Sequence, residues 1–166
     1  MPRFFAVAVV AGSLIFAAAG CGNDRPATGT AGSDPPIAQK TGASTTVKVV
    51  KTRYGRILVD GHGRALYLFT RERRAASRCY GACANAWPVF FARGKVRAGS
   101  GADRRLIGTT RRKDGRRQVT YAGRPLYYYV TDRKPGQITC QNVVEYGGTW
   151  LVVAPSGKAR RGPERS

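Results

Sequence analysis

Besides Cys21 near the N-terminus, the 166-residue chain has three cysteines, Cys79, Cys83 and Cys140, which are its most reactive internal side chains. In an oxidising compartment two of them pair and one is left over. Cys79 and Cys83 are close in sequence and can form a local disulfide if the chain bends at Gly81. A bond from either of them to Cys140 would close a longer loop and constrain the unfolded chain more. We favour the local pair, with Cys140 free or acting as the alternative partner.

His62 is the single histidine of the chain, which limits its metal and acid–base chemistry. Three thiolates and His62 would match the ligand types of a zinc site, but thiols in an oxidising compartment tend to form disulfides instead. The sequence contains no Cys-x-x-Cys-His haem attachment, no Gly-Lys-Ser/Thr phosphate loop and no Gly-x-Ser-x-Gly elbow. We expect no catalytic residue, no metal and no cofactor, and we predict that the protein is not an enzyme.

A segment of ten residues, rich in aromatic and charged side chains, occurs twice. Residues 63–72 read GRALYLFTRE and residues 123–132 read GRPLYYYVTD, with Gly, Arg, Leu and Tyr at matching positions. Such self-similarity indicates an internal duplication. The motif residues, each set followed by its tryptophan, are Tyr67, Phe69, Glu72 and Trp87 in the first copy and Tyr127, Tyr129, Asp132 and Trp150 in the second.

The motif side chains could serve two roles. Tyrosines flanked by arginines on an exposed face bind sugars, quinones or polyanions. Tyrosines on strands usually pack in the core and place their hydroxyls at its rim, and we favour this role for Tyr127 and Tyr129. Asp132 and Glu72 then cap the turn after each strand or form ion pairs, rather than act as a catalytic acid and base. The arginines that we expect to pair with them are Arg73, Arg124 and Arg133.

Short strands joined by tight turns must position these residues. Alternating and β-branched residues predict the strands, and Gly-rich or Asp-Gly segments predict the turns. The segment before Pro88 has small residues and no β-branched residue, so we expect a short helical turn around residues 80–86. Residues 93–105 should form a loop. The predicted strands cover residues 46–53, 57–59, 65–70, 89–91, 106–110, 118–121, 125–131, 143–146 and 149–153.

The duplication extends beyond the motif itself. When the two copies are aligned, Cys79 falls opposite Cys140, and Trp87 falls opposite Trp150. Each repeat is then a hairpin, a Cys-bearing connection and a Trp-led strand. Because neither unit could close a core alone, the two should pack together with approximate twofold symmetry.

These patterns predict a mainly β fold in a single domain, residues 47–155. Two duplicated hairpin or meander repeats, residues 54–92 and 106–155, should pack as a small sandwich or barrel. Roughly 110 residues suffice for one modest core. Residues 156–166, which contain four basic side chains, should form a disordered basic tail.

The N-terminus predicts export. Residues 1–20 contain one positive charge, an apolar run and small residues, the pattern of a secretory signal peptide that is too short for a comfortable membrane span. The sequence Ala19-Gly20-Cys21 resembles the end of a bacterial lipobox, in which the Cys is diacylated. We therefore expect lipidation at Cys21 and attachment to the extracytoplasmic face of the cell membrane. Residues 21–46, poor in large apolar side chains, should form a flexible tether.

The formal net charge is +20 at pH 7, from 29 Lys and Arg against 9 Asp and Glu. Such a charge favours anionic polymers or lipid headgroups. Nucleic acid is the usual partner of so basic a chain, but an exported, tethered protein rarely meets it, and we expect none. We expect a monomer whose basic surface contacts anionic lipid or cell-wall polymer. The main basic clusters are residues 71–74, 104–105, 111–113 and 116–117.

The combination of motifs over residues 54–157 resembles the bacterial secreted-repeat lipoproteins, predicted lipoproteins with a Tyr-x-aromatic-x-x-Asp motif and no established function. Besides the duplicated motif, the resemblance rests on Cys79-x-x-x-Cys83-Ala84 ending in Trp87-Pro88, Asp114-Gly115 before Gln118-Val119-Thr120-Tyr121, and Gly147-Gly148-Thr149-Trp150. Glu72 stands where the motif has Asp, which argues against a role that needs two equivalent Asp residues. Val89 stands where a second Pro is expected.

Two hypotheses of function follow. The first is a lipid-anchored envelope protein whose β repeats form a non-enzymatic binding or structural module. The alternative is a redox or cofactor-binding lipoprotein that uses the internal cysteines and a tyrosine-rich face. The differences between the two copies, such as Tyr128 against Leu68, are where a specific function would lie.

Overall fold

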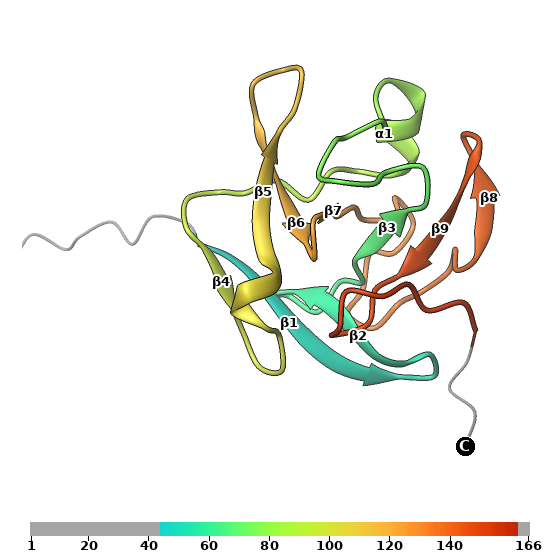
Figure 1. The fold of residues 1–166 in the computed structure, drawn as a ribbon. Helices are drawn as coiled ribbons and strands as arrows, with labels where there is room; N and C mark the ends of the chain where they lie inside the picture. The colour runs from blue at the N-terminus through green and yellow to red at the C-terminus, as the bar shows by residue number, and fades with distance from the viewer. Residues whose placement is uncertain (1–43, 163–166) are drawn as a thin grey trace, which may run out of the picture. The chain divides into compact units, whose positions relative to one another are not determined.

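The computed structural model describes residues 44–162, which lie within one compact unit, Gln39–Ser166. The predicted signal peptide, the lipidation site at Cys21 and nearly all of the tether lie outside the described residues. The described part is mainly β, as predicted, and its strands form three small sheets (Figure 1). No helix in residues 44–162 is long and apolar enough to cross a membrane.

Each repeat begins with an antiparallel hairpin. In the first repeat, which begins before the predicted start at residue 54, β1 (Thr45–Thr52) pairs with β2 (Gly55–Asp60). In the second repeat β5 (Ile107–Arg111) pairs with β6 (Arg117–Tyr121). The two hairpins lie in different sheets and appear at the bottom and the upper left of Figure 1.

The registers of the two hairpins define which residues are equivalent. Val47 lies opposite Asp60 in the first hairpin, and Ile107 lies opposite Tyr121 in the second. Asp60 and Tyr121 therefore occupy the same place in the two repeats. The motif begins after this place with Gly63 and Gly123, whose φ angles of 88° and 71° are favourable for glycine.

The remaining strands complete the three sheets. Strand β4 pairs in parallel with β1, so that the first sheet has the order β2-β1-β4. The second has the order β3-β9-β8, and the third has the order β5-β6-β7. The bounds of these strands are Tyr67–Phe69 for β3, Val96–Ala98 for β4, Arg124–Pro125 for β7, Val143–Glu145 for β8 and Gly148–Val152 for β9.

The Trp-led segment of each repeat pairs with the central strand of the other repeat. Strand β9 of the second repeat pairs with β3 of the first, with Phe69 opposite Trp150. After Trp87 of the first repeat, Val89 forms a bridge with Tyr127 of the second, and Phe90 N–H donates to Leu126 O at 3.1 Å. The repeats thus exchange their closing segments, which explains why neither could close a core alone.

Two buried apolar clusters fill the domain, and both contain residues of both repeats. Ile57 and Val59 of β2 belong to the first cluster, whereas Leu58 belongs to the second. This alternation follows from the period of two along a strand. Because β2 is buried on both faces, its Ile-Leu-Val run is continuous rather than alternating with polar residues.

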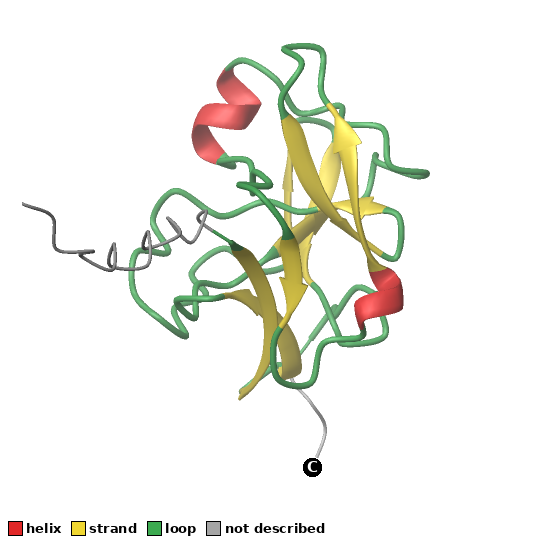
Figure 2. Ribbon diagram, turned by 90° about the vertical axis from the view of Figure 1, so that its left-hand side faces the viewer, coloured by secondary structure: helices red, strands yellow, loops and turns green. Residues whose placement is uncertain are grey.

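Several predictions need correction. Of the two predicted alternatives, sandwich and barrel, a closed barrel is not formed by residues 44–162, because their strands divide into three separate sheets. The predicted loop 93–105 contains β4 and the start of a 3-10 turn, Arg104–Leu106. The strand predicted at 125–131 is reduced to β7, since the chain there forms single bridges instead of a ladder. The predicted helical turn is confirmed as α1 (Ala82–Ala86), and Figure 2 shows the two short helical segments on opposite sides of the strands.

The chain does not leave the domain at the end of the predicted 47–155 unit. Arg160 N–H donates to Val152 O at 2.9 Å, and Ala154 N–H donates to Lys158 O at 2.8 Å. Residues 156–160 of the predicted disordered tail therefore fold back along β9. At the other end, β1 begins at Thr45, a buried residue within the predicted tether.

Candidate functional site

The motif tyrosines and carboxylates form crossed pairs between the two repeats. Tyr67 and Tyr127 lie opposite each other and exchange backbone hydrogen bonds of 2.8 and 3.0 Å. The hydroxyl of Tyr67 donates to Oδ2 of Asp132, and the hydroxyl of Tyr127 donates to Oε1 of Glu72 at 2.7 Å. Each tyrosine thus binds the carboxylate of the other copy, and all four side chains are at most 1% exposed.

The motif arginines cross between the copies in the same way. Arg64 Nε donates to the backbone O of Asp132 at 3.0 Å, and Arg124 Nη2 donates to the backbone O of Phe69 at 3.1 Å. The ion pairs of the described residues join Arg105 to Asp103 and Arg116 to Asp114. The predicted ion pairs of Glu72 and Asp132 with Arg73, Arg124 and Arg133 are therefore not formed.

Each motif carboxylate also closes the loop that follows it. Asp132 Oδ1 accepts the backbone N–H of Thr139 at 2.9 Å and its hydroxyl at 2.6 Å. Glu72 Oε1 accepts the backbone N–H of Arg78 at 2.6 Å, whereas Glu72 Oε2 is buried and has no hydrogen-bond partner among residues 44–162. Burial raises the pKa of Glu72, although the donors from Arg78 and Tyr127 oppose this shift. The two carboxylates therefore occupy equivalent positions but differ in hydrogen bonding within the described residues: both oxygens of Asp132 accept hydrogen bonds, whereas only one oxygen of Glu72 does.

Glu72 should make stability depend on pH in a way that Glu72→Gln removes. The folded-state pKa is raised above the ordinary value of 4.5, so the folded protein binds this proton more tightly than the unfolded chain. Its stabilising contribution is complete below pH 4.5 and is lost as the pH rises through the folded-state pKa. Urea unfolding between pH 4 and 8 should show the fall in wild type and a flatter profile in Glu72→Gln. Parallel profiles for the two proteins would contradict the assignment.

Six aromatic rings form a continuous stack at the centre of the domain. Trp87 and Trp150 lie face to face, with ring centroids 4.1 Å apart and planes 3° apart. Phe69 stacks on Trp150 at 4.2 Å, and Tyr129 lies against Trp87 at 4.7 Å. Tyr67 and Tyr127 meet the tryptophans edge to face at 5.3 and 5.2 Å. Except for Tyr129, which is half-buried, these rings lie in the core and do not form an exposed binding face.

The predicted local disulfide is confirmed. Cys79 and Cys83 are bonded, with Cα atoms 5.3 Å apart, and Cys140 is free and half-buried. Burial raises the pKa of the Cys140 thiol, and a hydrogen bond with Tyr129 opposes the shift. A thiol with a raised pKa is a poor nucleophile at neutral pH. Among the described residues no group of three His, Cys, Asp or Glu side chains is placed to hold a metal ion.

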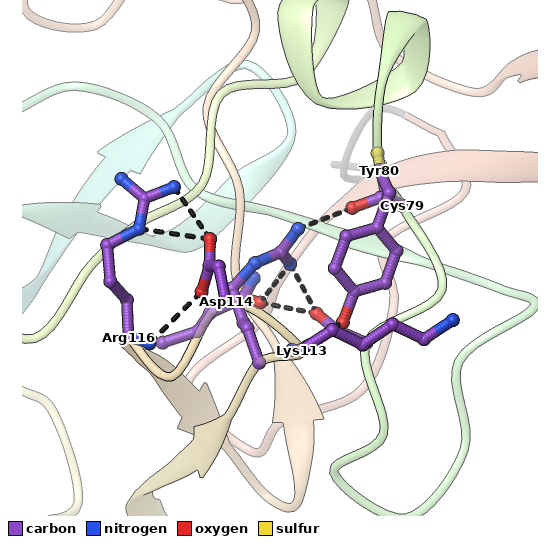
Figure 3. Close-up of polar contacts among 8 residues, drawn as sticks. Cys79, Tyr80, Lys113, Asp114 and Arg116 are labelled. Atoms are coloured by element: carbon purple, nitrogen blue, oxygen red, sulfur yellow. Dashed lines mark hydrogen bonds and ion pairs between the residues drawn. The ribbon is translucent and has the colours of Figure 1, made fainter.

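A buried polar network surrounds the carbonyl group of Cys79. Arg112 is 5% exposed, and its Nη2 donates to Cys79 O at 2.7 Å. Its Nη1 donates to Ser77 Oγ at 2.6 Å and to Gln118 Oε1 at 2.8 Å. Figure 3 shows the contact to Cys79 together with the Asp114–Arg116 ion pair of the same turn. Because Ser77 also bonds the Tyr127 hydroxyl, the network extends to Glu72.

A cavity of about 460 Å³ opens where β2 ends. Asp60 is 5% exposed, and its Oδ2 accepts the hydroxyl of Tyr128 at 3.0 Å. The guanidinium carbon of Arg64 lies 4.1 Å from the centre of the Tyr128 ring. Burial, followed by the charge of Asp60, raises the pKa of Tyr128, so its hydroxyl stays protonated. We name this cavity the Tyr128 pocket, after a lining that includes Asp60, His62, Arg64, Phe90, Arg93 and Tyr128.

A second cavity of about 350 Å³ lies between β4 and β5 and is strongly basic. Arg117 Nη2 donates to Thr109 Oγ1 at 2.7 Å, which fixes the guanidinium group along the hairpin. The side chains of Lys95 and Arg104 are exposed and form no ion pair with an acid of the described chain. We call this cavity the basic groove, and its lining contains no Asp or Glu.

Sequence reasoning missed the residues of the Tyr128 pocket as a group. The sequence suggests a functional role for His62 only as a metal ligand, and it predicts for Asp60 and Arg93 only their places in a turn and a loop. The one available signal was the difference between Tyr128 and Leu68 in otherwise similar copies. The motif residues were found from the sequence, but the structure brings them together as packing partners in the core.

The comparisons with known proteins agree with the duplicated architecture. A family model described as a secreted repeat of unknown function matches residues 48–90 and again residues 108–154. Each match begins in the first hairpin strand of a repeat and includes its motif and its tryptophan. No curated protein and no solved structure matches the chain. The description as a secreted repeat agrees with the export predicted from residues 1–20, and the chain belongs to this secreted-repeat family of unknown function.

Proposed function

We propose that this protein is a monomeric, lipid-anchored component of the bacterial cell envelope, in which the duplicated β domain is a non-enzymatic module that binds anionic envelope polymer or lipid headgroups. The observation that carries the proposal is the basic groove. Three cations, Lys95, Arg104 and Arg117, line a concave surface without an acidic residue. Such a surface attracts polyanions and loses affinity when salt screens the charges.

The anchoring part of the proposal rests on Cys21. It follows an apolar run and the small residues Ala19 and Gly20, as in a lipobox. Two acyl chains hold a protein stably at a membrane, whereas a basic patch alone gives reversible attachment. The anchor would keep the basic groove close to the anionic surface and raise its effective concentration there.

The non-enzymatic part is supported by the state of the motif residues. Tyr67, Tyr127, Glu72 and Asp132 are buried and hydrogen-bonded to one another across the repeats. A catalytic acid or base must reach a substrate, and these four side chains are at most 1% exposed. Nothing in the described residues favours the redox alternative, because Cys79 and Cys83 are bonded and the proposed aromatic face lies mostly in the core.

Washing of membranes tests both parts together. The full chain is expressed with its own leader in a bacterium, and membranes are washed at low salt and at about 1 M salt, where the screening length is about 3 Å. Wild type should stay bound in both washes. Cys21→Ser should stay at low salt and be released at high salt. Cys21→Ser combined with Lys95→Gln, Arg104→Gln and Arg117→Gln should bind at least about tenfold less at low salt.

A matched variant controls for loss of charge alone. Lys51→Gln, Arg73→Gln and Arg133→Gln remove the same number of charges from exposed side chains outside the basic groove. Combined with Cys21→Ser, they should leave low-salt binding nearly unchanged. Release of wild type by salt would refute the anchor, and equal losses in the two triple variants would refute the groove. The salt-released protein can then be offered phosphatidylglycerol vesicles and purified cell-wall fragments to identify the anionic surface.

A further inference from the structure

The Tyr128 pocket exists because the two repeats differ at a few equivalent positions. Asp60 of the first repeat is equivalent to Tyr121 of the second, as the hairpin registers show. Tyr121 is completely buried, and its hydroxyl donates to Pro155 O at 2.8 Å. A carboxylate side chain in place of this ring leaves volume unfilled in the first repeat. Tyr128, equivalent to Leu68, borders the volume with a polar ring.

The turn that frames the pocket also differs between the repeats. The first turn runs from Asp60 to Arg64, whose backbones are joined by a hydrogen bond of 3.0 Å from Asp60 N–H to Arg64 O. The second turn is one residue shorter, because Tyr121 pairs directly with Arg124. The longer turn places His62 in the pocket lining, where the second repeat has only the short Ala122-Gly123 turn. Hence the turn that brings His62 into the lining is specific to the first repeat, Tyr128 comes from the second repeat, and neither is required by the shared architecture.

Both oxygens of the Asp60 carboxylate accept hydrogen bonds from the protein. Its Oδ1 accepts the backbone N–H groups of His62 and Arg64 at 2.8 and 2.9 Å, and its Oδ2 accepts the Tyr128 hydroxyl. Asp60 therefore shapes the turn and orients Tyr128. These bonds occupy three of the roughly four acceptor positions of the carboxylate.

The cationic groups of the pocket, in contrast, retain free donors. Arg64 uses Nε on Asp132 O, and its two Nη groups form no hydrogen bond with residues 44–162. The exposed side chain of Arg93 forms neither a hydrogen bond nor an ion pair within the described chain. Guanidinium groups with free Nη donors bind phosphate and carboxylate in a forked geometry.

Ser44, Thr45 and Thr46 line one further side of the pocket, and the remaining wall is apolar. Phe90 lies edge to face against Tyr128, with ring centroids 5.4 Å apart, and Val89 and Phe91 continue this wall. At about 460 Å³ the space is much larger than an inorganic anion requires and lies within the range of small-molecule sites. The lining therefore suits a molecule with an anionic end and a ring-sized body.

We propose that the Tyr128 pocket binds a small organic oxyanion, with a phosphate or carboxylate group on Arg64 and Arg93 and a sugar-sized or aromatic ring against Phe90. The site is separate from the basic groove and does not depend on polymer binding there. Asp60 holds Tyr128 and the turn in place, so the ligand meets an ordered wall. The oxyanion accepts hydrogen bonds from guanidinium Nη groups that have no acceptor within residues 44–162.

Calorimetric titration of the soluble mature chain, residues 21–166 with Cys21→Ser, tests this proposal. The probes are phenyl phosphate, benzoate, glucose 6-phosphate and inorganic phosphate, each up to 10 mM. We expect at least one ring-bearing probe to bind more tightly than inorganic phosphate by about tenfold or more. Comparison of phenyl phosphate with benzoate shows whether the pocket prefers phosphate or carboxylate. Comparison of phenyl phosphate with glucose 6-phosphate shows whether it prefers an aromatic ring or a sugar.

Matched variants locate the binding. Arg93→Gln should weaken the best probe about tenfold or more, whereas Arg97→Gln, an equal loss of charge on β4 outside the pocket lining, should change it less than about twofold. Tyr128→Leu, which introduces the residue of the other copy, should abolish binding, and Tyr128→Phe should weaken it because Asp60 Oδ2 loses its donor. Circular dichroism confirms that each variant is folded, and Arg93→Gln leaves every backbone hydrogen bond in place.

Two results would overturn the proposal. One is no heat of binding with any of the four probes; the other is equal weakening by Arg93→Gln and Arg97→Gln, which would indicate general electrostatics. The triple variant of the basic groove should bind the best probe as wild type does. If the membrane test fails but the probes still bind, the basic-groove proposal is wrong and the pocket proposal stands. If the membrane test succeeds but no probe binds, the pocket proposal is wrong and the basic-groove proposal stands.

Discussion

Trp150→Ala should lower the free energy of unfolding by about 3–5 kcal/mol. The indole is completely buried and contacts Trp87, Phe69 and Tyr127, so its removal opens a cavity in the middle of the aromatic stack. The neighbouring rings belong to both repeats, and they cannot close the space without moving the exchanged strands. Urea unfolding followed by circular dichroism measures the loss. Val144→Ala, at a side chain that is 72% exposed, should change stability by less than about 0.5 kcal/mol.

The two tryptophans should respond differently to Phe. Trp87 Nε1 donates to Glu145 Oε2 at 2.8 Å, whereas Trp150 Nε1 is buried and has no partner among the described residues. Trp87→Phe therefore loses a hydrogen bond, whereas Trp150→Phe removes an N–H donor that has no acceptor within residues 44–162. We expect Trp87→Phe to cost about 1 kcal/mol more. A larger cost for Trp150→Phe would show that the indole N–H of Trp150 has a partner in solution.

The duplication and its core role were predictable because they depend on local patterns. Strand alternation, the Gly that starts each motif and the small residues around Cys83 act over a few positions, and each led to the correct element. Sequence proximity favoured the Cys79–Cys83 bond, although pairing with Cys140 stayed open. The buried state of Tyr127 followed from the usual packing of strand aromatics.

The pairing between copies was not predictable from either copy. Whether Tyr127 meets the carboxylate of its own repeat or that of the other depends on the exchange of closing strands, and similar motifs fit both arrangements. Strand β4 was missed because Val96-Arg97-Ala98 has little strand pattern and is held by a short parallel pairing with β1. The Tyr128 pocket arises from a register shift at Asp60, which an alignment of the motifs alone does not reveal.

Asp132→Ala should be nearly as damaging as removal of a tryptophan, with an expected loss of about 3–5 kcal/mol. The carboxylate accepts the Tyr67 hydroxyl on one oxygen and the N–H and hydroxyl of Thr139 on the other. Its truncation leaves the buried Tyr67 hydroxyl without an acceptor, because this hydroxyl has no second partner within residues 44–162. The loop that Thr139 closes is released as well. Urea unfolding of the single variants measures the loss.

Glu72→Ala is the matched change in the other copy and should cost less, by about 1–2 kcal/mol. The Tyr127 hydroxyl keeps Ser77 as a partner, and truncation of Glu72 also removes a buried oxygen that has none. A double-mutant cycle with Tyr67→Phe and Asp132→Ala should give a coupling energy of about 1–3 kcal/mol, and the cycle with Tyr127→Phe and Glu72→Ala a smaller one. Equal losses and equal couplings would show that the two crossed pairs are energetically equivalent, despite the unpartnered oxygen of Glu72.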